Sequence, residues 1–458
     1  RDRFSYQGLY SEDRLTQPML RENGKLREVD WQDALRAAAK TLKDTNPQRL
    51  GVLVSPSATL EEQYLSAKLA RGLGSPNIDH RLRQQDFRGD AADPALPWLG
   101  QSFDELASAD AVLLVGSWLR KDQPLLNHRV RLAQREGGQV MAINPVAFDF
   151  NFELDVDVVC SPSAMTRELA GVAAALGADT AGIEVVADQA HQAIADALKN
   201  AEQGTLLLGT AAQMHPDFSL LRALADGIAR SAGITLGFVG TVSNDTGGWM
   251  AGAVPNRQPG GKPVETPGAA VATMIQDPPE LMVTIGFEPE MDVADPAAMA
   301  AALGGSQVVA LTSYLSPWLE AHADILLPIA AFTETSGTYV NLLGEAMLGE
   351  GEAERRLELR FRDGTIESLR DLGANVAQTL VRVEPMLIAN IYPQHNEDRV
   401  LVRLEDVPPL LVDALIATED RKFFEHHGLD LQAIARALHA NLRAGRTVQG
   451  GSTLTQQL

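Results

Sequence analysis

Cysteine is nearly absent from this sequence, since Cys160 is the only one among 458 residues. A single thiol excludes a disulfide framework. It also excludes an iron–sulfur cluster or a cysteine-based zinc site held by this chain alone. The neighbours of Cys160, two valines before it and a Ser-Pro pair after it, predict a buried small apolar residue.

Positive charge and long apolar runs are also scarce. The chain has 39 Lys and Arg against 60 Asp and Glu, a net charge of -21, which argues against nucleic acid or an anionic membrane surface as partner. It has no run of about 18 apolar residues, so no transmembrane helix is predicted. It begins with Arg1 without a signal-peptide pattern and stops inside a motif, so we expect both ends to be cut.

Short runs of aliphatic residues alternate with amphipathic helices over the first 340 residues. A helix is predicted from Asp30 and Trp31, with apolar residues at helical spacing up to Leu42. Runs that are apolar on both faces suit parallel strands covered by helices, which predicts a doubly wound α/β architecture. The predicted strands are 50–54, 111–115, 139–143, 205–208, 281–285 and 307–311.

Three loops follow such strands and are candidate ligand-binding elements. Residues 116–124 and 286–290 each begin with a glycine that leaves a buried strand, as anion and nucleotide sites of open α/β sheets do. Many strand–helix turns need a glycine without binding anything. Residues 332–341 collect hydroxyl and acidic side chains around Gly337, a composition typical of a ligand-lining loop.

Residues 1–342 resemble the molybdopterin oxidoreductase family, and within it the members that form the large G subunit of bacterial NADH–quinone oxidoreductase, respiratory complex I. The resemblance lies in segments 3–9, 13–19, 72–79 and 323–341. It implies a molybdenum-enzyme fold kept as a scaffold, with no cofactor bound by this chain and with other complex I subunits as partners. Active molybdenum chemistry would need a cysteine, selenocysteine or serine ligand, and the sequence identifies none.

The composition changes near Leu342. Residues 343–353 are acidic and contain glycine without periodicity, which predicts a linker or join. Residues 354–404 alternate as short strands do, with a run at 357–362 and a turn at Asp363 and Gly364. Helical patterns follow in 405–458, with a stop at Gly445.

Two motifs in this last part carry candidate chemistry. Glu419 ends an apolar helix, where partial burial raises a carboxyl pKa and suits a general base. Without the surrounding motif, a solvated helix end would be the better explanation. Gly450 and Gly451 precede Ser452 and Thr453, which suits a pyrophosphate cradle at a helix N-terminus; a turn with a capping box from Thr453 to Gln456 is the alternative.

Together, 418–430 and 445–457 resemble the first motifs of the family-51 peptidoglycan glycosyltransferases of class A, 1B-type penicillin-binding proteins. The resemblance implies that Glu419 is the catalytic base for attack on a lipid-linked disaccharide (lipid II), commonly assisted by a divalent cation. It also implies substrate-binding roles beside the donor pyrophosphate for Ser452, Thr453, Gln456 and Gln457. The family's second glutamate has no counterpart before Leu458, so a half-built site is expected to be inactive.

The expected fold is therefore α/β, doubly wound and molybdopterin oxidoreductase-like (1–342). It is joined to a small α+β domain and to the first helices of an α-helical, lysozyme-like glycosyltransferase domain. The first part implies a place in the cytoplasm, peripheral to the inner membrane, and the second implies its periplasmic face. Because one chain cannot serve both compartments, a chimera is the preferred hypothesis. The expected function is that of a structural domain of the complex I G subunit, without clusters; the alternative is a peptidoglycan glycosyltransferase.

Overall fold

The computed structural model describes residues 8–335 and 337–344, together with short strands further on. The chain forms two compact units, one of Tyr6–Leu387 and the other of Arg1–Ser5 with Ile388–Leu458. In the second unit the described residues form an antiparallel pair, β18 (Ile391–Tyr392) with β19 (Glu397–Asp398).

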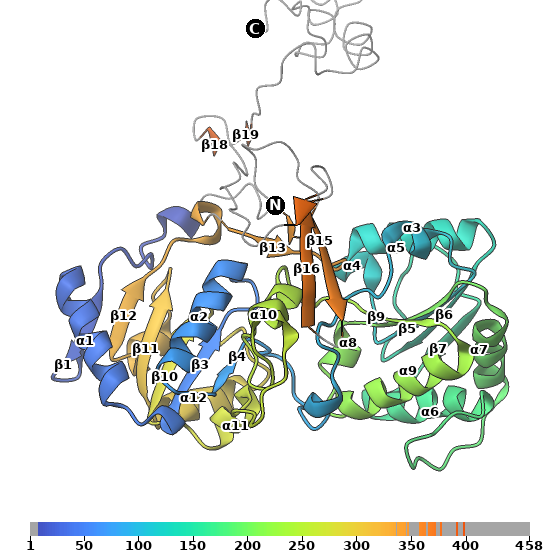
Figure 1. Cartoon of the computed structure of the whole chain (residues 1–458), viewed down its shortest axis with the longest axis horizontal. Coiled ribbons are helices and arrows are strands. Elements are labelled where there is room, and N and C mark those ends of the chain that lie inside the picture. The colour runs from blue at the N-terminus through green and yellow to red at the C-terminus, as the bar shows by residue number, and fades with distance from the viewer. Residues whose placement is uncertain are drawn as a thin grey trace, which may run out of the picture. The chain divides into compact units, whose positions relative to one another are not determined.

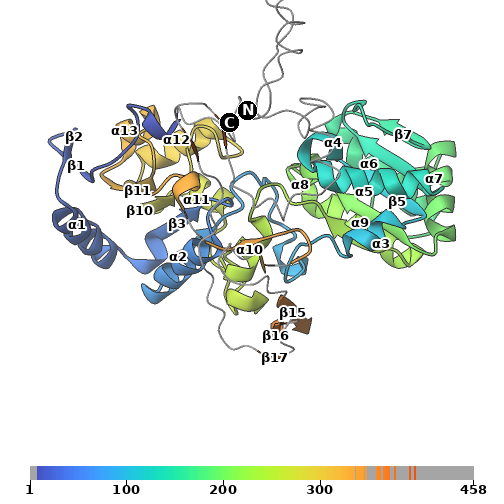
Figure 2. The same ribbon diagram turned by 90° about the horizontal axis from the view of Figure 1, so that it is seen from above.

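Among the described residues, the first unit holds two large, separate sheets with helices on both sides, and two small antiparallel sheets (Figures 1 and 2). The first sheet has the order β2-β1-β12-β11-β10-β3-β4. Its strands are β1 (Met19–Glu22), β2 (Lys25–Glu28), β3 (Leu50–Val54), β4 (Ile78–Asp79), β10 (Leu281–Ile285), β11 (Gln307–Thr312) and β12 (Ile325–Pro328). All neighbours from β4 to β12 are parallel, and β1 and β2 add an antiparallel hairpin at one edge.

The second sheet is entirely parallel, with the order β7-β6-β5-β8-β9. Its strands are β5 (Ala111–Val115), β6 (Gln139–Asn144), β7 (Val156–Val159), β8 (Gly204–Leu208) and β9 (Thr235–Phe238). Strand order reverses between β5 and β8 here, and between β3 and β10 in the first sheet. Such reversals are the places where open α/β sheets bind ligands.

Helices bury the apolar faces of both sheets. On the first sheet, one face carries α1 (Trp31–Asp44) and α2 (Leu60–Gly72), and the other α11 (Val271–Gln276), α12 (Pro296–Gly304) and α13 (Pro317–His322). On the second sheet, α6 (Met165–Ala175), α7 (Gln189–Asn200) and α9 (Phe218–Ala232) face α3 (Phe103–Ala107) and α5 (Pro124–Arg135) across the strands. Each sheet is thus the middle of three layers, as the aliphatic runs predict.

The remaining described elements are short. The α-helices are α4 (Leu119–Asp122), α8 (Thr210–Gln213) and α10 (Asp245–Ala251). The 3-10 turns are η2 (Gly8–Tyr10), η3 (Pro47–Arg49), η4 (Asp90–Ala92), η5 (Pro162–Ala164), η6 (Pro259–Gly261) and η7 (Phe332–Glu334). The last strands of this unit are β13 (Tyr339–Val340), β14 (Ala346–Met347), β15 (Leu357–Arg362), β16 (Thr365–Asp371) and β17 (Val376–Ala377).

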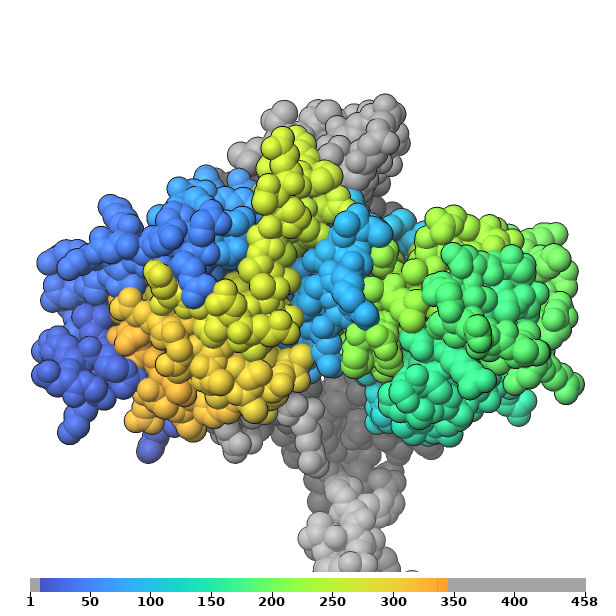
Figure 3. All heavy atoms as spheres, turned by 90° about the horizontal axis from the view of Figure 1, so that it is seen from below, coloured from blue at the N-terminus to red at the C-terminus, as the bar shows by residue number. Residues whose placement is uncertain are grey.

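The second sheet and its helices are an insertion in the first. We call the part around the first sheet the first lobe and the part around the second sheet the second lobe. The chain builds β3 and β4, makes all of β5 to β9, and returns for β10 to β12. Figure 3 shows this insertion by colour. The first lobe combines the blue and orange stretches of the chain, whereas the second lobe is teal and green.

Most predicted elements within the described residues are confirmed, with one difference. The six predicted strands coincide with β3, β5, β6, β8, β10 and β11, and Asp30 caps α1 by accepting the Asp33 N–H. The predicted hairpin around Asp363 and Gly364 is confirmed by β15 and β16. The stretch predicted as a linker contains β14, which pairs with β13. The helical part expected in 405–458 lies outside the described residues.

Candidate functional site

The two lobes meet at a cavity lined by loops at the carboxyl ends of strands from both sheets. Its volume is about 160 Å³. From the first lobe it receives Ser55 and Ser57 after β3, residues 80–84 after β4 and Asp292 after β10. From the second it receives Gln213 and Met214 of the α8 region and residues 241–242 after β9. Both strand-order reversals therefore contribute to one site.

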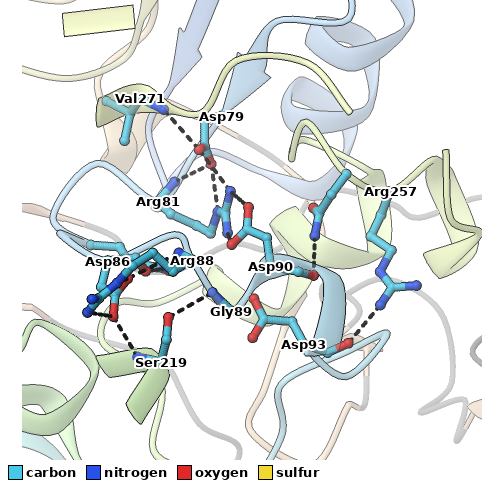
Figure 4. Close-up of polar contacts among 12 residues, drawn as sticks. Asp79, Arg81, Asp86, Arg88, Gly89, Asp90, Asp93, Ser219, Arg257 and Val271 are labelled. Carbon is cyan, nitrogen blue, oxygen red and sulfur yellow. Dashed lines mark hydrogen bonds and ion pairs between the residues drawn. The ribbon is translucent and has the colours of Figure 1, made fainter. Parts of the chain in front are cut away.

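Residues 80–84 and Asp93 line this cavity, and they belong to a segment, residues 79–93, that is built on a buried arginine. The Arg81 guanidinium donates to both oxygens of Asp79, with Nε 2.8 Å from Oδ1 and Nη2 3.0 Å from Oδ2 (Figure 4). On its other side it donates to both oxygens of Asp90, at 2.8 and 3.1 Å. The ring of Phe87 lies 4.7 Å from the guanidinium carbon. Paired forks of this kind are the strongest geometry that an arginine can adopt.

A second clamp of the same form follows seven residues later. The Arg88 N–H and Nε both donate to Asp86 Oδ1, at 3.1 and 2.9 Å, as the corresponding groups of Arg81 do to Asp79. Each Asp-x-Arg unit is therefore a turn closed by its own carboxylate, with the arginine side chain folded back onto it. We call these two units the Asp-Arg clamps.

The second clamp also joins the lobes. Asp86 Oδ2 accepts the N–H of Ser219 in α9 at 2.8 Å, and Arg88 Nη2 donates to Asp217 at 2.8 Å. The Gly89 N–H donates to Ser219 Oγ at 2.8 Å. Burial acts to raise the pKa of Asp86, but the hydrogen bonds from Arg88 and Ser219 outweigh it and lower that pKa to about 2.

Asp93 lines the same cavity and behaves differently. It is 9% exposed and forms an ion pair with Arg222 of α9, whose Nε lies 3.1 Å away without hydrogen-bond geometry. Burial raises the pKa of Asp93 to about 6, and neighbouring Asp90 adds to this rise while Arg222 opposes it. Asp93 thus changes charge at a higher pH than an exposed aspartate would.

His80 and Asp245 complete the wall. His80 Nδ1 lies 2.9 Å from the Ala253 carbonyl oxygen, and its Nε2 lies 3.2 Å from Asp245 Oδ1. Burial acts to raise the pKa of Asp245, but hydrogen bonds from His80 and Thr241 outweigh it and lower that pKa. The imidazole packs directly against α10 at Gly248. A Cβ at this glycine would lie only 2.6 Å from the ring. Both ring nitrogens are therefore engaged in structural contacts.

Two of the three loops predicted from sequence make structural contacts, and the third borders hollows of the described structure. In the first, the Ser117 N–H donates to Asn144 Oδ1 at 2.8 Å, and Gly116 (φ 59°) packs against Ala212, so no free anion cradle is formed. The predicted loop 286–290 places Glu288 and Glu290 in a separate groove, and Asp292, just after it, borders the cavity. The segment around Gly337 closes over the first turn of α2, where the Thr338 hydroxyl donates to Glu61 at 2.6 Å.

Cys160 is half-buried and packs at the edge of the core around α6. Burial, with a further contribution from Glu168, raises the pKa of the Cys160 thiol to about 11, so the thiolate is disfavoured. The apolar role predicted for it agrees with this environment, although Cys160 is half-buried and not fully buried. The predicted glycosyltransferase residues Glu419, Ser452, Thr453, Gln456 and Gln457 lie outside the described residues.

Sequence reasoning did not identify the Asp-Arg clamps. Their signal was present as two Asp-x-Arg tripeptides, Asp79 to Arg81 and Asp86 to Arg88, in a stretch between buried strands. A charge-rich stretch normally indicates a solvated loop, and only the packing of two lobes around it reveals burial.

Two mostly parallel, helix-covered sheets meeting over a cavity define a two-lobed, doubly wound α/β protein. Residues 14–356 match the molybdopterin oxidoreductase family. Because this match spans more than half of the chain, the chain belongs to that family. Residues 384–458 match the transglycosylase family. The chain therefore carries segments of both, and the boundary between 342 and 354 stays a prediction.

Relatives with a known name fall into the same two groups. The G subunit of the NADH-quinone oxidoreductase of Streptomyces coelicolor is 26% identical over 406 residues, which cover 78% of this chain and 46% of the relative. Penicillin-binding protein 1B of Haemophilus influenzae is 49% identical over 109 residues, which cover 24% of this chain and 14% of the relative. The chain thus spans less than half of either relative.

Solved structures agree on the fold. Acetylene hydratase from Pelobacter acetylenicus superimposes with a TM-score of 0.57 at 14% identity, over 74% of this chain and 58% of that one. The formyltransferase/hydrolase complex of Methylorubrum extorquens gives a TM-score of 0.50, also at 14% identity, over 71% and 90%. These likenesses confirm the doubly wound architecture. Among the helices that the structure describes, none has the length and apolar character needed to cross a bilayer.

A molybdenum–pterin group, which the family name implies, does not fit the residues at the cavity. The volume of about 160 Å³ is well below the roughly 300–1,000 Å³ of sites for drug-sized ligands, and a pterin nucleotide is larger still. No thiol is among the residues that line this cavity. Arg81 and His80, which line the cavity, are tied to protein partners.

Proposed function

We propose that residues 1–342 form a structural domain of an NADH–quinone oxidoreductase, respiratory complex I, in the position of its G subunit. In this role the domain binds neighbouring subunits of the complex at the cytoplasmic side of the inner membrane. It carries neither an iron–sulfur cluster nor a molybdenum cofactor of its own. The similarity to the G subunit over 78% of the chain supports the assignment.

The observation that carries this proposal is the site between the lobes, where arginine and carboxylate side chains are fixed to one another. Arg81 has both edges of its guanidinium bound by Asp79 and Asp90, so it is not free to bind a phosphate or pterin. Opening the site for a cofactor would leave buried charges without partners, at a cost of several kcal/mol. These paired buried charges hold the site in one conformation, which suits a rigid scaffold.

Two measurements test the scaffold function. The chain is purified from molybdate-fed cells and its metals are measured by mass spectrometry; we expect molybdenum and iron far below one atom per chain. The tagged chain is also recovered from bacteria with mild detergent, and we expect named complex I subunits to co-purify. Stoichiometric molybdenum, or recovery without any complex I subunit, would refute the proposal.

A second candidate function is supported by the similarity of the C-terminal part to penicillin-binding protein 1B. We propose that residues 405–458 correspond to the start of a peptidoglycan glycosyltransferase domain that acts at the periplasmic face of the inner membrane. There Glu419 would act as the base toward lipid II. Ser452, Thr453, Gln456 and Gln457 would bind its pyrophosphate, with a divalent cation.

The test of this second function is binding of a fluorescent lipid II analogue, with Mg²⁺ and with EDTA. We expect Glu419→Gln to bind the analogue as the parent chain does and Ser452→Ala/Thr453→Ala to weaken it at least fivefold. Equal binding by all three chains would indicate detergent partitioning and would count against the assignment.

A further inference from the structure

A groove separate from the cavity between the lobes lies at the carboxyl ends of β10 and β11. Its volume is about 890 Å³. One wall is the segment of residues 11–19, which is held in place because the Leu15 N–H donates to the Ser313 carbonyl and the Leu315 N–H donates to the Asp13 carbonyl. The opposite wall is the loop after β10. These hydrogen bonds show that the groove is a built part of the first lobe.

The lining of this groove is strongly acidic. Its carboxylates are Glu12, Asp13, Glu28, Glu288, Glu290 and Glu320. Arg14 is the one basic residue among the lining residues that the structure describes, and it is paired with Glu334 and lies over the Tyr314 ring. The groove is therefore left with uncompensated negative charge.

Two of these carboxyl groups show the effect of that charge. Glu290 Oε2 is buried and has no hydrogen-bond partner among the described residues. Burial raises the pKa of the Glu288 carboxyl, and the nearby negative charges of Asp292 and Glu290 raise it further. A buried carboxylate oxygen without a hydrogen-bond partner is unfavourable, so a cation bound beside Glu290 would lower the free energy of this site.

The shape of the groove distinguishes between kinds of cation. Among the described residues, no three acidic, histidine or cysteine groups converge closely enough to hold a metal ion. The carboxylates are instead spread along the groove, beside apolar surface from Trp318, Tyr314 and the side chain of Met291, which is 66% exposed. Spaced carboxylates and aromatic rings are the partners of arginine side chains, which bind carboxylates bidentately and stack on rings.

The loop that forms the outer wall is rigidly supported. Arg83 donates to the Met291 carbonyl at 3.0 Å, and the Glu288 N–H donates to Asp292 Oδ2 at 2.9 Å. A preformed wall reduces the entropy lost when a flexible segment binds.

We propose that this groove binds an extended, arginine-containing segment of a neighbouring protein. The inference rests on the proposed scaffold function, since it names the chemistry by which the domain holds a partner. The segment places guanidinium groups on Glu288, Glu290 and the acidic side chains of the opposite wall. Its apolar residues lie on Met291 and Trp318.

The experiment measures fluorescence anisotropy of a labelled nine-residue peptide with arginine at alternate positions, titrated with the full chain at low salt. We expect saturable binding of one peptide per chain, weakened at least tenfold by Glu288→Gln/Glu290→Gln and also by Met291→Lys. The matched control, Glu136→Gln/Glu202→Gln, removes two exposed charges from the second lobe and is expected to change the affinity less than twofold. Circular dichroism checks that each variant is folded.

The alternatives give different results. Equal weakening by the groove and control variants would mean that the peptide follows only the net charge of -21, which would overturn the proposal. Competition by spermine as strong as by the arginine peptide would also overturn it, because a small polycation would then be sufficient. If peptide binding fails while complex I subunits still co-purify, the groove assignment is wrong and the scaffold function stands.

Discussion

Arg81 shows how much a single buried charge can contribute to this fold. Its side chain is 3% exposed, and Asp79, its partner, is fully buried. Burial acts to lower the arginine pKa, but the two aspartates outweigh it and raise that pKa, so the guanidinium stays charged. Removal of this arginine would leave two aspartates without their main partner.

We therefore predict that Arg81→Met lowers the free energy of unfolding by about 3–5 kcal/mol, the usual cost of an orphaned buried charge. Urea denaturation followed by tryptophan fluorescence measures it. The control is Arg83→Met, whose side chain is 49% exposed and lies 3.7 Å from Asp292, where a loss under about 1 kcal/mol is expected. Similar losses in both variants would contradict the assigned role of Arg81.

Asp93 contributes to the free energy of unfolding in a way that falls as the pH rises, because its pKa is raised in the folded chain. Its pKa is about 6 in the folded chain and 3.8 in the reference state, so the folded protein holds this proton more tightly. The resulting stabilisation is complete below pH 3.8 and is lost as the pH rises through 6. Other carboxylates, such as Asp86 with its pKa of about 2, act in the opposite direction.

A comparison with Asp93→Asn isolates this effect. We expect the stability of the parent chain, relative to the variant, to fall by about 2–3 kcal/mol between about pH 4 and pH 7. Guanidinium unfolding at several pH values measures the difference. If the difference is constant with pH, or rises, the environment assigned to Asp93 is wrong.

At the scale of elements, α10 depends on a glycine in its middle. The His80 ring occupies the position that a side chain at Gly248 would need, and two hydrogen bonds fix the ring in that place. By contrast, a Cβ at Gly72, the last residue of α2, would meet nothing within 4 Å.

We predict opposite effects of alanine at these two glycines. Gly248→Ala should destabilise the chain by about 1–3 kcal/mol through overpacking, whereas Gly72→Ala should be neutral or stabilise it by up to about 1 kcal/mol through helix propensity. Thermal unfolding with calorimetry compares the two. A harmless Gly248→Ala would show that the imidazole can move away.

The elements that sequence could predict are those with a strong local signal. The buried strands, such as β5 and β10, are long aliphatic runs and were predicted at their observed places. The hairpin of β1 and β2 is not among the predicted elements, although Asn23 and Gly24 lie between its strands. Both adopt positive φ, 51° and 78°, which is the two-residue turn that such a pair favours. Strand β4 has only two residues, too few for a pattern.

At the scale of the whole molecule, the lobes are joined by polar contacts of the second clamp. Asp86 is 4% exposed and reaches α9 of the other lobe through Ser219. Contacts between residues distant in sequence determine which strands pair across the insertion. They also place the clamps between the two lobes. Local patterns contain no information on either, so the site could not be predicted in detail.

We predict that Asp86→Ala uncouples the lobes. Without this carboxylate the Ser219 N–H and the Arg88 side chain lose their partner, and the energy that links the two lobes falls. Calorimetry should then resolve two unfolding steps where the parent chain shows one. A single step at a lower temperature would mean that Asp86 stabilises the chain without coupling its lobes.

The insertion of one lobe into the other has a consequence for synthesis on the ribosome. Strand β3 pairs directly with β10, yet the whole second lobe is translated between them. The nascent second lobe has all of its strands in one continuous stretch and can fold as it emerges, whereas β3 and β4 must wait with an open apolar edge. Chaperone binding during translation should therefore concentrate on the early strands and cease once β10 has left the exit tunnel.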